Sequence, residues 1–337
     1  MEAVSPPVAS GGRSLLERSP LARLPDRVLR WTLTALAGAV VVVLVYFFVR
    51  LYLESQPAFS KFGVFGFVFG NNWDIPANVF KAWPLVAGTL ITSVIALVIG
   101  VPVALCSALF LTEMCPRRVR APLTGMVELL AAVPSVVYGL WGVFVLIPKL
   151  KPVEQWISDT FHFIPFIGSG TIAGPNYFIA GLILAIMVVP IVSSISREVM
   201  ATVPVEHKEA ALALGATRWE MIRIAVLPYS RAGVTGAAML GLGRAIGETI
   251  AVTLVIGNSA TLGHHIFDQG YTLAAVIANE FGEADPGSLH LHALFAAGLV
   301  LFVMTVVINA IARGLVAHAG RGRNVTPQTT VSPGAVA

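Results

Sequence analysis

Six long runs of apolar residues, separated by shorter polar segments, organise this chain of 337 residues. The runs lie near Trp31 to Val49, Leu85 to Leu111, Leu129 to Ile147, Tyr177 to Ile195, Gly233 to Gly257 and His292 to Ala312. An α-helix needs roughly 20 apolar residues to cross about 30 Å of hydrocarbon, and each run has about that length. The pattern therefore predicts an all-α, polytopic membrane protein with six transmembrane helices.

Composition supports a membrane protein independently of this pattern. Hydrophobic residues make up 56% of the chain and charged residues only 12%, which is more apolar than a soluble core of this size requires. Pro102, Pro134 and Pro190 lie inside three of the apolar runs. Neighbouring helices in a bundle tolerate such prolines, so we expect them to mark kinks rather than functional sites.

The Lys and Arg residues predict how the helices are oriented. Most of the 22 fall on one side of the predicted topology, and the other side carries only Arg50, Lys61, Lys81, Lys149 and Lys151. The positive-inside rule places the richer side in the cytoplasm, together with both termini and the segment 196–232. This topology explains the net charge of +4. We therefore expect membrane lipid, and no nucleic acid, around the basic segments.

The same pattern divides the chain into four segments. Residues 1–27 are rich in Ser, Pro and Gly and predict a disordered basic arm, and residues 314–337 predict a disordered tail. Residues 28–84 hold the first transmembrane helix and an outer loop. The apolar run of that helix is too long for a typical signal peptide, so we expect it to stay uncleaved. Residues 85–313 form a core of five transmembrane helices.

The sequence carries no motif for catalysis or for nucleotide binding. The G-x-x-x-x-G-K-[ST] loop, the G-x-S-x-G turn and the H-E-x-x-H helix are all absent from it. His264, His265 and Asp268 are close in sequence, but so short a motif is more typical of a solvated loop than of a metal site. We expect a non-catalytic subunit that binds no metal and no cofactor and takes its energy from another chain.

The segment 196–232 is a charged, helix-forming island between two apolar runs. Gly215 follows the last apolar residue of a predicted helix, where a left-handed conformation ends that helix. Thr217 and Glu220 have the spacing of a capping box, which predicts a second helix. A capped helix–turn–helix indicates a docking element, and an amphipathic linker resting on the membrane surface is the alternative.

This segment resembles the EAA loop of ABC importer permeases. The residues that carry the resemblance are Glu209, Ala210, Ala211, Gly215, Leu227 and Pro228. Ala225 stands where the family usually has isoleucine. The resemblance implies that the loop sits in a groove of a separate cytoplasmic ATPase and passes its closure to the membrane helices.

Two charged residues fall inside the fifth apolar run. Arg244 lies about 16 Å from Gly233 at 1.5 Å per residue, near the bilayer midplane, where a charge costs roughly 2.5 to 3.5 kcal/mol. Glu248 is four residues further on and therefore shares its helix face. Gly243 and Gly247 form a G-x-x-x-G step that predicts close packing of another helix. We interpret the arginine as part of an anion pathway, and the alternative is an ion pair that only fixes helix packing.

Three stretches resemble the PstC-type permeases of phosphate ABC importers: Val133 to Gly142, Gly241 to Thr249 and Ile277 to Phe281. The resemblance covers about Phe59 to Ala312 and implies a type I ABC importer permease in a bacterial cytoplasmic membrane, with inorganic phosphate as substrate. It also implies a homologous PstA-type permease subunit, a PstB-type ATPase dimer that uses ATP-Mg, and a PstS-type extracytoplasmic phosphate-binding protein.

Three other functions stay open at this point. A permease for sulfate or molybdate suits an arginine fork comparably well, and substrate competition distinguishes it. An ion-coupled secondary transporter would use Arg244 and Glu248 as a relay without an ATPase, which the capped loop argues against. A scaffold or phosphate-sensing subunit would leave both charges dispensable for uptake.

The predicted outer loop from Gly257 to Leu291 is acidic. It has no Lys or Arg, and its acidic residues are Asp268, Glu280, Glu283 and Asp285. Because this charge repels a free anion, we expect the loop to dock basic residues of a binding protein. The alternative is an ordinary solvated loop.

Overall fold

The computed structural model describes residues 24–164, 166–168, 172 and 174–321, and these residues are almost entirely helical. The helices are α1 (Leu24–Phe62), α2 (Val64–Phe69), α3 (Trp83–Leu109), α4 (Arg117–Ala132), α5 (Ser135–Trp141), α6 (Ile147–Thr160), α7 (Tyr177–Ala201), α8 (Val205–Ala213), α9 (Arg218–Met221), α10 (Leu227–Gly247), α11 (Ile250–Ile256), α12 (Leu273–Glu280) and α13 (Leu289–Arg321). Short π-helical stretches extend or join some of them at Phe110–Met114 (η2), Gly142–Leu146 (η3) and Ile222–Val226 (η4). Strands β1 (Trp73–Asp74) and β2 (Val79–Phe80) form an antiparallel hairpin.

The chain divides into two compact units, Met1–Leu53 and Glu54–Ala337. In the first unit, every residue of α1 from 27 to 50 is exposed. Helix α1 begins at Leu24, inside the segment 1–27 predicted to be a disordered arm. Helix α13 of the second unit continues to Arg321, inside the predicted tail 314–337. The remaining residues of the arm and of the tail lie outside the described ones.

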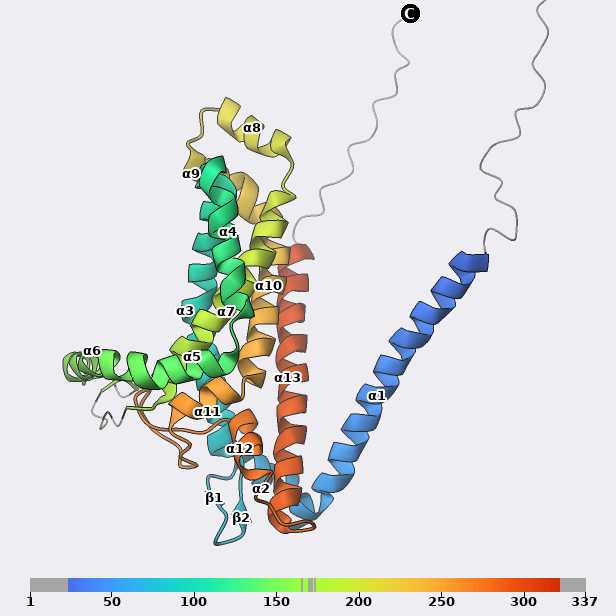
Figure 1. The fold of residues 1–337 in the computed structure, drawn as a ribbon, viewed down its shortest axis with the longest axis vertical. Helices are drawn as coiled ribbons and strands as arrows, with labels where there is room; N and C mark the ends of the chain where they lie inside the picture. Colours follow the sequence, from blue (N-terminus) through green and yellow to red (C-terminus); the bar gives the residue numbers. More distant parts are fainter. Residues whose placement is uncertain (1–23, 165, 169–171, 173, 322–337) are drawn as a thin grey trace, which may run out of the picture. The chain divides into compact units, whose positions relative to one another are not determined.

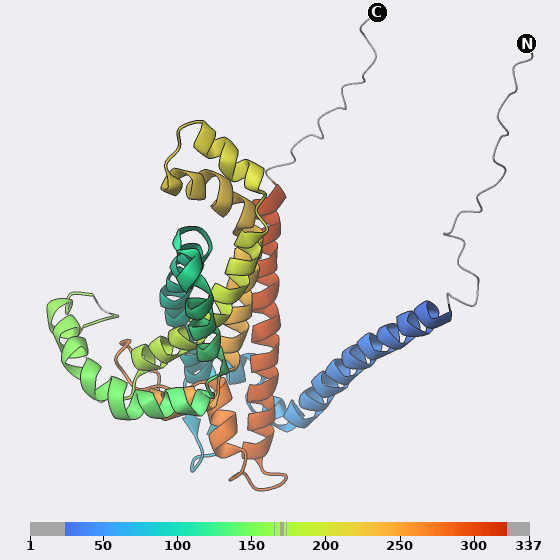
Figure 2. The same ribbon diagram turned by 45° about the horizontal axis from the view of Figure 1, so that its top comes forward.

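In the second unit, α3, α7, α10 and α13 run side by side, with α7 between α3 and α10 (Figures 1 and 2). Small residues bring α3 and α7 into close contact. An ideal Cβ at Gly100 would lie 3.2 Å from the Ala185 carbonyl oxygen, and one at Gly181 would lie 2.5 Å from a methyl group of Ile95. Apolar side chains of α7 fill the centre of this bundle. Such small-residue contacts are typical of helices packed in a membrane.

Two of the predicted spans are not continuous helices. The run from Leu129 to Ile147 crosses a break at Val133 and Pro134, whose ψ angles of 128° and 140° are extended. Proline has no N–H to donate and disfavours the α conformation in the residue before it, so α4 ends and α5 starts in a new direction (Figure 1). The membrane-length helical segment here is Ser135–Thr160, so the predicted bounds of the third span were wrong.

The fifth predicted span, Gly233 to Gly257, is also interrupted. Helix α10 ends at Gly247 and α11 begins at Ile250, and the two helices are bent by 63°. Among the described residues, five helices are long and apolar enough to cross a membrane, and the number is six if this bent pair crosses as one span. The protein is therefore an all-α, multi-pass membrane protein, as the sequence predicts.

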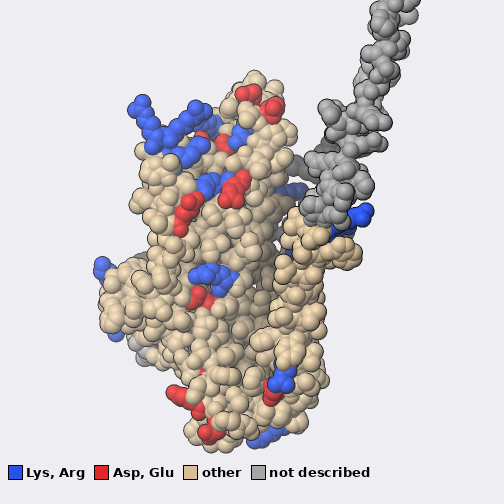
Figure 3. Space-filling view, turned by 45° about the vertical axis from the view of Figure 1, so that its right-hand side comes forward, with Lys and Arg blue, Asp and Glu red and all other residues tan. Residues whose placement is uncertain are grey.

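The two ends of the bundle have different architectures. Helices α8 and α9 lie at one end, and the β-hairpin with α2 and α12 lies at the other (Figure 1). On the face that Figure 3 shows, most Lys, Arg, Asp and Glu side chains gather toward these two ends, and fewer lie between them. This distribution is the one expected of a bundle whose middle faces hydrocarbon.

Candidate functional site

Arg244 and Glu248 lie where the fifth span breaks. The Nη2 atom of Arg244 is 3.9 Å from Oε2 of Glu248, so the two side chains share one face as predicted but make only a loose ion pair. The Arg244 side chain is 40% exposed, and that of Glu248 is 9% exposed. The arginine is therefore accessible to a ligand, whereas the glutamate is held inside the protein.

Glu248 also caps the helix that follows the break. Its backbone is extended, with ψ 128°, and its Oε1 accepts a hydrogen bond of 3.4 Å from the backbone N–H of Ala251. A carboxylate near the first turn of a helix is favoured by the exposed N–H groups there. The Glu248 side chain thus stabilises the start of α11 and also approaches Arg244. The sequence analysis did not predict the first of these contacts, because it assumed an unbroken fifth helix.

The break leaves backbone groups of α10 without helical partners. The Thr249 hydroxyl donates a hydrogen bond of 3.3 Å to the Gly247 carbonyl. A positive charge is favoured near a helix C-terminus, and Arg244 lies in the last turn of α10. Irregular backbone at membrane depth is tolerated where it lies inside protein or lines a water-filled cavity, and discontinuous helices of this kind form binding sites in transporters.

The two broken spans meet each other through their second halves. An ideal Cβ at Gly139 of α5 would lie 2.6 Å from Leu254 Cδ1 of α11, so glycine permits this contact. The Tyr138 hydroxyl donates a hydrogen bond of 2.8 Å to the Leu130 carbonyl and so bridges the break at Pro134. Helices α5 and α11, which are far apart in sequence, therefore lie in contact.

The glycine step beside Arg244 has no helix packed on it. Among the described residues, nothing lies within 4 Å of an ideal Cβ at Gly243 or Gly247. Gly241 makes the close contact instead, since its Cβ would lie 2.7 Å from Val188 and 2.8 Å from Val192 of α7. The close packing of another helix predicted for Gly243 and Gly247 stays a prediction.

The capped helix–turn–helix predicted within 196–232 is confirmed. Gly215 has φ +85° and separates α8 from α9. The Thr217 hydroxyl and N–H both donate to the Glu220 carboxylate, at 2.8 and 2.7 Å, and the Glu220 N–H donates to the Thr217 hydroxyl at 3.3 Å. These bonds form a complete capping box. Helix α9 then continues through η4 into α10.

The EAA-like residues divide between a buried face and an exposed face. Ala211 is buried with the apolar core of this end, Leu227 and Pro228 are half-buried, and Glu209 and Ala210 are exposed. Leu214 and Trp219, close by in sequence, are 90% and 63% exposed. An exposed apolar surface rimmed by polar residues marks an interaction site.

Two ion pairs that the sequence analysis did not specify anchor this end of the molecule. Lys208 Nζ of α8 lies 2.6 Å from Glu113 Oε1 in η2, which continues α3. Arg197 of α7 forms an ion pair with Glu128 of α4 at 2.7 Å. The partners are 95 and 69 residues apart, so no local pattern connects them. The first pair links α8 to the end of α3, and the second joins α7 to α4.

The acidic loop at the opposite end does not present all its carboxylates to solvent. Glu280 is 9% exposed, and its Oε2 accepts hydrogen bonds from Trp73 Nε1 at 3.1 Å and from His290 Nε2 at 2.8 Å. Asp268 Oδ2 accepts from the backbone N–H groups of His264 and His265. Glu280 is therefore enclosed by the fold and does not offer its carboxylate to a partner, whereas docking through the rest of the loop stays a prediction.

The exposed carboxylates of this loop are Glu283 and Asp285. Tyr271 supports the buried part of the loop, and its hydroxyl accepts a hydrogen bond of 2.9 Å from the Asn279 amide. Burial, assisted by Glu280 and Glu283, raises the pKa of Tyr271 to about 12, so the phenol stays neutral. Among the described residues, no group of three His, Cys, Asp or Glu side chains is placed to hold a metal ion.

The sequence of this chain is similar to the sequences of known transport proteins. Residues 100–323 match the family described as binding-protein-dependent transport system inner membrane component. The phosphate transport system permease protein PstC of Mesorhizobium japonicum is 45% identical over 86% of this chain and 89% of its own length. The PstC 2 protein of Mycobacterium tuberculosis is 40% identical over 87% of this chain and 92% of its own.

A solved structure shares the fold. A bacterial ABC transporter involved in the import of the acidic polysaccharide alginate aligns with a TM-score of 0.58 at 18% identity. The alignment covers 88% of this chain and 99% of that chain. At this identity, the likeness supports the architecture and carries no argument about the substrate.

Proposed function

This chain belongs to the inner membrane component family of binding-protein-dependent transport systems, and from that premise we propose that it is the permease subunit of an ATP-driven importer of inorganic phosphate. The relatives named as phosphate permeases support the substrate. The structural observation that carries the proposal is an accessible Arg244 at a helix break inside the membrane, with only a loose 3.9 Å contact to its carboxylate partner.

Arg244 has the chemistry that a phosphate pathway needs. Its planar guanidinium presents several donors in a fixed fork, which fits two oxygens of a tetrahedral oxyanion. When no anion is bound, Glu248 compensates the charge, so the resting pathway holds no isolated cation. When an anion binds, Arg244 leaves Glu248, and the glutamate keeps its contact with the start of α11.

The energy for transport comes from partner chains. In our proposal the α8–α9 segment docks in a groove of a PstB-type ATPase dimer, which binds and hydrolyses ATP-Mg, while this chain is not catalytic. A homologous PstA-type subunit completes the permease, and a PstS-type binding protein delivers phosphate from outside the cell. The end that carries α8 and α9 then faces the cytoplasm of a bacterial cell, and so do both termini.

The ion pairs at this end give the coupling a physical route. ATPase closure moves α8, and the Lys208–Glu113 pair transmits that movement to α3. Ala211 packs in the same apolar cluster as Met200 of α7 and Val226 of η4, immediately before α10. Helix α10 carries Arg244, so movement of the docking segment reaches the pathway through packed side chains.

Reconstitution tests this function directly. The complete complex in proteoliposomes should accumulate labelled phosphate only when both ATP and the loaded binding protein are present. Excess sulfate or molybdate should leave phosphate uptake unchanged. Uptake that proceeds without ATP would favour an ion-coupled transporter, and strong competition by sulfate or molybdate would favour a permease for a different oxyanion.

A further inference from the structure

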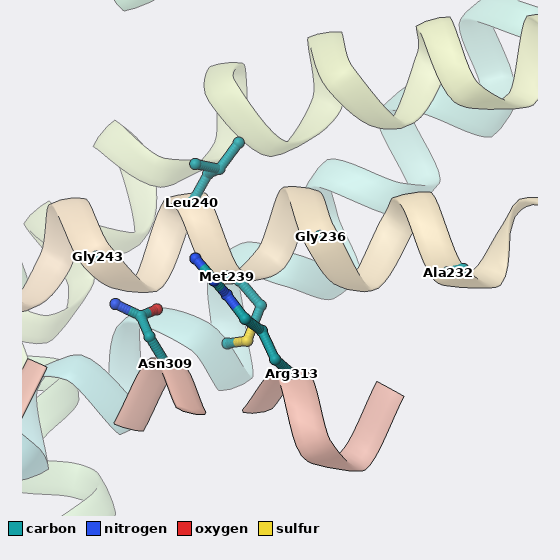
Figure 4. Close-up of a pocket in the computed structure, with 7 residues that line it drawn as sticks. All are labelled: Ala232, Gly236, Met239, Leu240, Gly243, Asn309 and Arg313. Atoms are coloured by element: carbon teal, nitrogen blue, oxygen red, sulfur yellow. The ribbon is translucent and has the colours of Figure 1, made fainter. Parts of the chain in front are cut away.

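A cavity of about 650 Å³ lies between α10 and α13, on the cytoplasmic side of Arg244 (Figure 4). It is lined by Ala232, Gly236, Met239, Leu240, Gly243, Asn309 and Arg313. The wall from α10 is entirely apolar, and the polar groups come from α13. The α10 wall of this trough-shaped cavity therefore carries no charge, and it faces the Asn309 amide and the Arg313 guanidinium of α13.

Glycines keep the α10 wall of this cavity open. An ideal Cβ at Gly236 or Gly243 would meet nothing within 4 Å. Gly243 directly precedes Arg244, and Ala232 lies 11 residues earlier, about 16 Å along the helix at 1.5 Å per residue. The trough therefore extends from the level of Arg244 toward the cytoplasmic end of α10.

Arg313 and Asn309 face this trough. The Arg313 side chain crosses toward α10 near Met239 and Leu240, and Asn309 lies beside Gly243 (Figure 4). Helical side chains lean toward the N-terminus of their helix, which for α13 is the outer end. An arginine that served only as an interfacial anchor would extend toward the cytoplasmic surface instead. Within the described part of the chain, no carboxylate pairs with Arg313 and no group hydrogen-bonds the Asn309 amide.

We propose that this cavity is the inner station of the phosphate pathway, where Arg313 and Asn309 receive the oxyanion that Arg244 releases. This inference rests on the proposed function and extends it by a second binding position. The guanidinium and the NH₂ group of the amide both donate hydrogen bonds, which the oxygens of an oxyanion accept. The cavity is far larger than one phosphate ion, and Arg313 is exposed, so the anion is held weakly enough to leave.

Thiol modification of the intact complex tests this station. Cys106 is exposed, so it is first replaced by serine, and Asn309→Cys is then introduced. The reagent is a cationic methanethiosulfonate, applied to complexes in nanodiscs of phosphatidylcholine alone. Inorganic phosphate should slow the modification by about tenfold, and chloride should not. Adding Arg313→Gln should abolish this protection, because the fork that holds the anion is lost.

Arg118→Gln provides the matched control, since Arg118 is an exposed arginine at the same end of the molecule but outside the cavity. It should leave the protection by phosphate unchanged. Absence of protection, or protection that survives Arg313→Gln, would overturn the proposal. Protection that appears only in nanodiscs with anionic phospholipid, and not with phosphate, would assign the cavity to a lipid headgroup and also overturn it.

Failure of this inference differs from failure of the proposed function. If Arg244→Ala still transports phosphate, the pathway through Arg244 is wrong, yet protection of Asn309→Cys still reports whether phosphate reaches Arg313. If uptake depends on Arg244 but phosphate does not protect Asn309→Cys, the permease function stands and the inner station falls. In uptake assays, Arg313→Gln should lower the maximal rate several-fold, and Arg313→Lys should restore part of it.

Discussion

Lys208 Nζ and Glu113 Oε1 lie 2.6 Å apart and join the docking helix α8 to the end of α3. Their side chains are 19% and 9% exposed, so the pair is shielded from solvent more than a surface salt bridge. In the proposed transporter this contact passes movement of the ATPase to a membrane helix. It joins the EAA-like segment to α3, whereas α9 continues along the backbone into α10.

Breaking this pair should uncouple the two parts. Glu113→Gln removes the ion pair, and Lys208→Met removes the charged hydrogen bond as well. We expect each change to cost about 1 to 3 kcal/mol and to lower ATP-driven uptake strongly. Exchanging the two residues in a Lys208→Glu, Glu113→Lys double variant should restore part of the uptake. A double-mutant cycle on uptake per assembled complex measures the coupling, and strictly additive effects would show that the pair transmits nothing.

The effect of a substitution at Gly215 should depend only on how readily the new residue adopts a positive φ. Its φ is +85° and the space around it is open, so a new side chain meets no atom but suffers backbone strain. A branched residue in this region costs about 1 to 2 kcal/mol, whereas asparagine adopts it more readily. Gly215→Val should therefore abolish ATP-driven uptake while the membrane helices still insert, and Gly215→Asn should retain most of it. Equal uptake by the two variants would contradict this account.

The contact between α5 and α11 should depend on Gly139. An added Cβ there would lie 2.6 Å from Leu254, and overpacking of this kind costs about 1 to 3 kcal/mol. Gly139→Ala should lower uptake by displacing α11 and the break that holds Glu248. Gly125→Ala is the control, since a Cβ at that helical position meets nothing within 4 Å. Uptake and thermal stability of both purified complexes check this, and an unaffected Gly139→Ala complex would refute it.

Substituting the buried Glu280 should lower stability, whereas substituting the exposed Glu283 should affect only docking of the binding protein. Glu280→Lys places a cation beside His290 and Trp73 in a buried position, and we expect it to cost more than about 2 kcal/mol of stability. Glu283→Lys changes an exposed residue and should leave the melting temperature unchanged. It should weaken binding of the binding protein at low salt but not at high salt. Equal affinities of the Glu283→Lys and parental complexes at low salt would exclude electrostatic steering by this residue.

Local sequence patterns predicted the turn between α8 and α9 and its capping box correctly. The Gly215 turn and the Thr217–Glu220 capping box are encoded within a few residues, so their structure follows from spacing alone. Hydrophobicity also located the apolar segments. It did not register the breaks at Pro134 and after Gly247, because an apolar run stays apolar whether its backbone is helical or extended.

The sequence predicted only those features of the Arg244 site that depend on residues close together in the chain. Arg244 and Glu248 share a face because they are four residues apart, but the capping role of Glu248 depends on a break that the pattern did not show. The partners of Glu280 are Trp73, 207 residues away, and His290. Arg313 reaches the α10 trough only through the packing of α13 beside α10. Such contacts are set by tertiary structure and leave no local signature.

The central claim is that phosphate crosses the membrane past Arg244. Its most direct test is labelled phosphate uptake per assembled complex for Arg244→Ala, with Arg244→Lys and Glu248→Gln measured alongside. Arg244→Ala should reduce uptake to background while the ATPase subunits still assemble, because α8 and α9 are untouched. Lysine should restore only part, since it keeps the charge but loses the planar fork, and Glu248→Gln should impair uptake without loss of protein yield. An Arg244→Ala complex that transports phosphate at the parental rate would contradict the account.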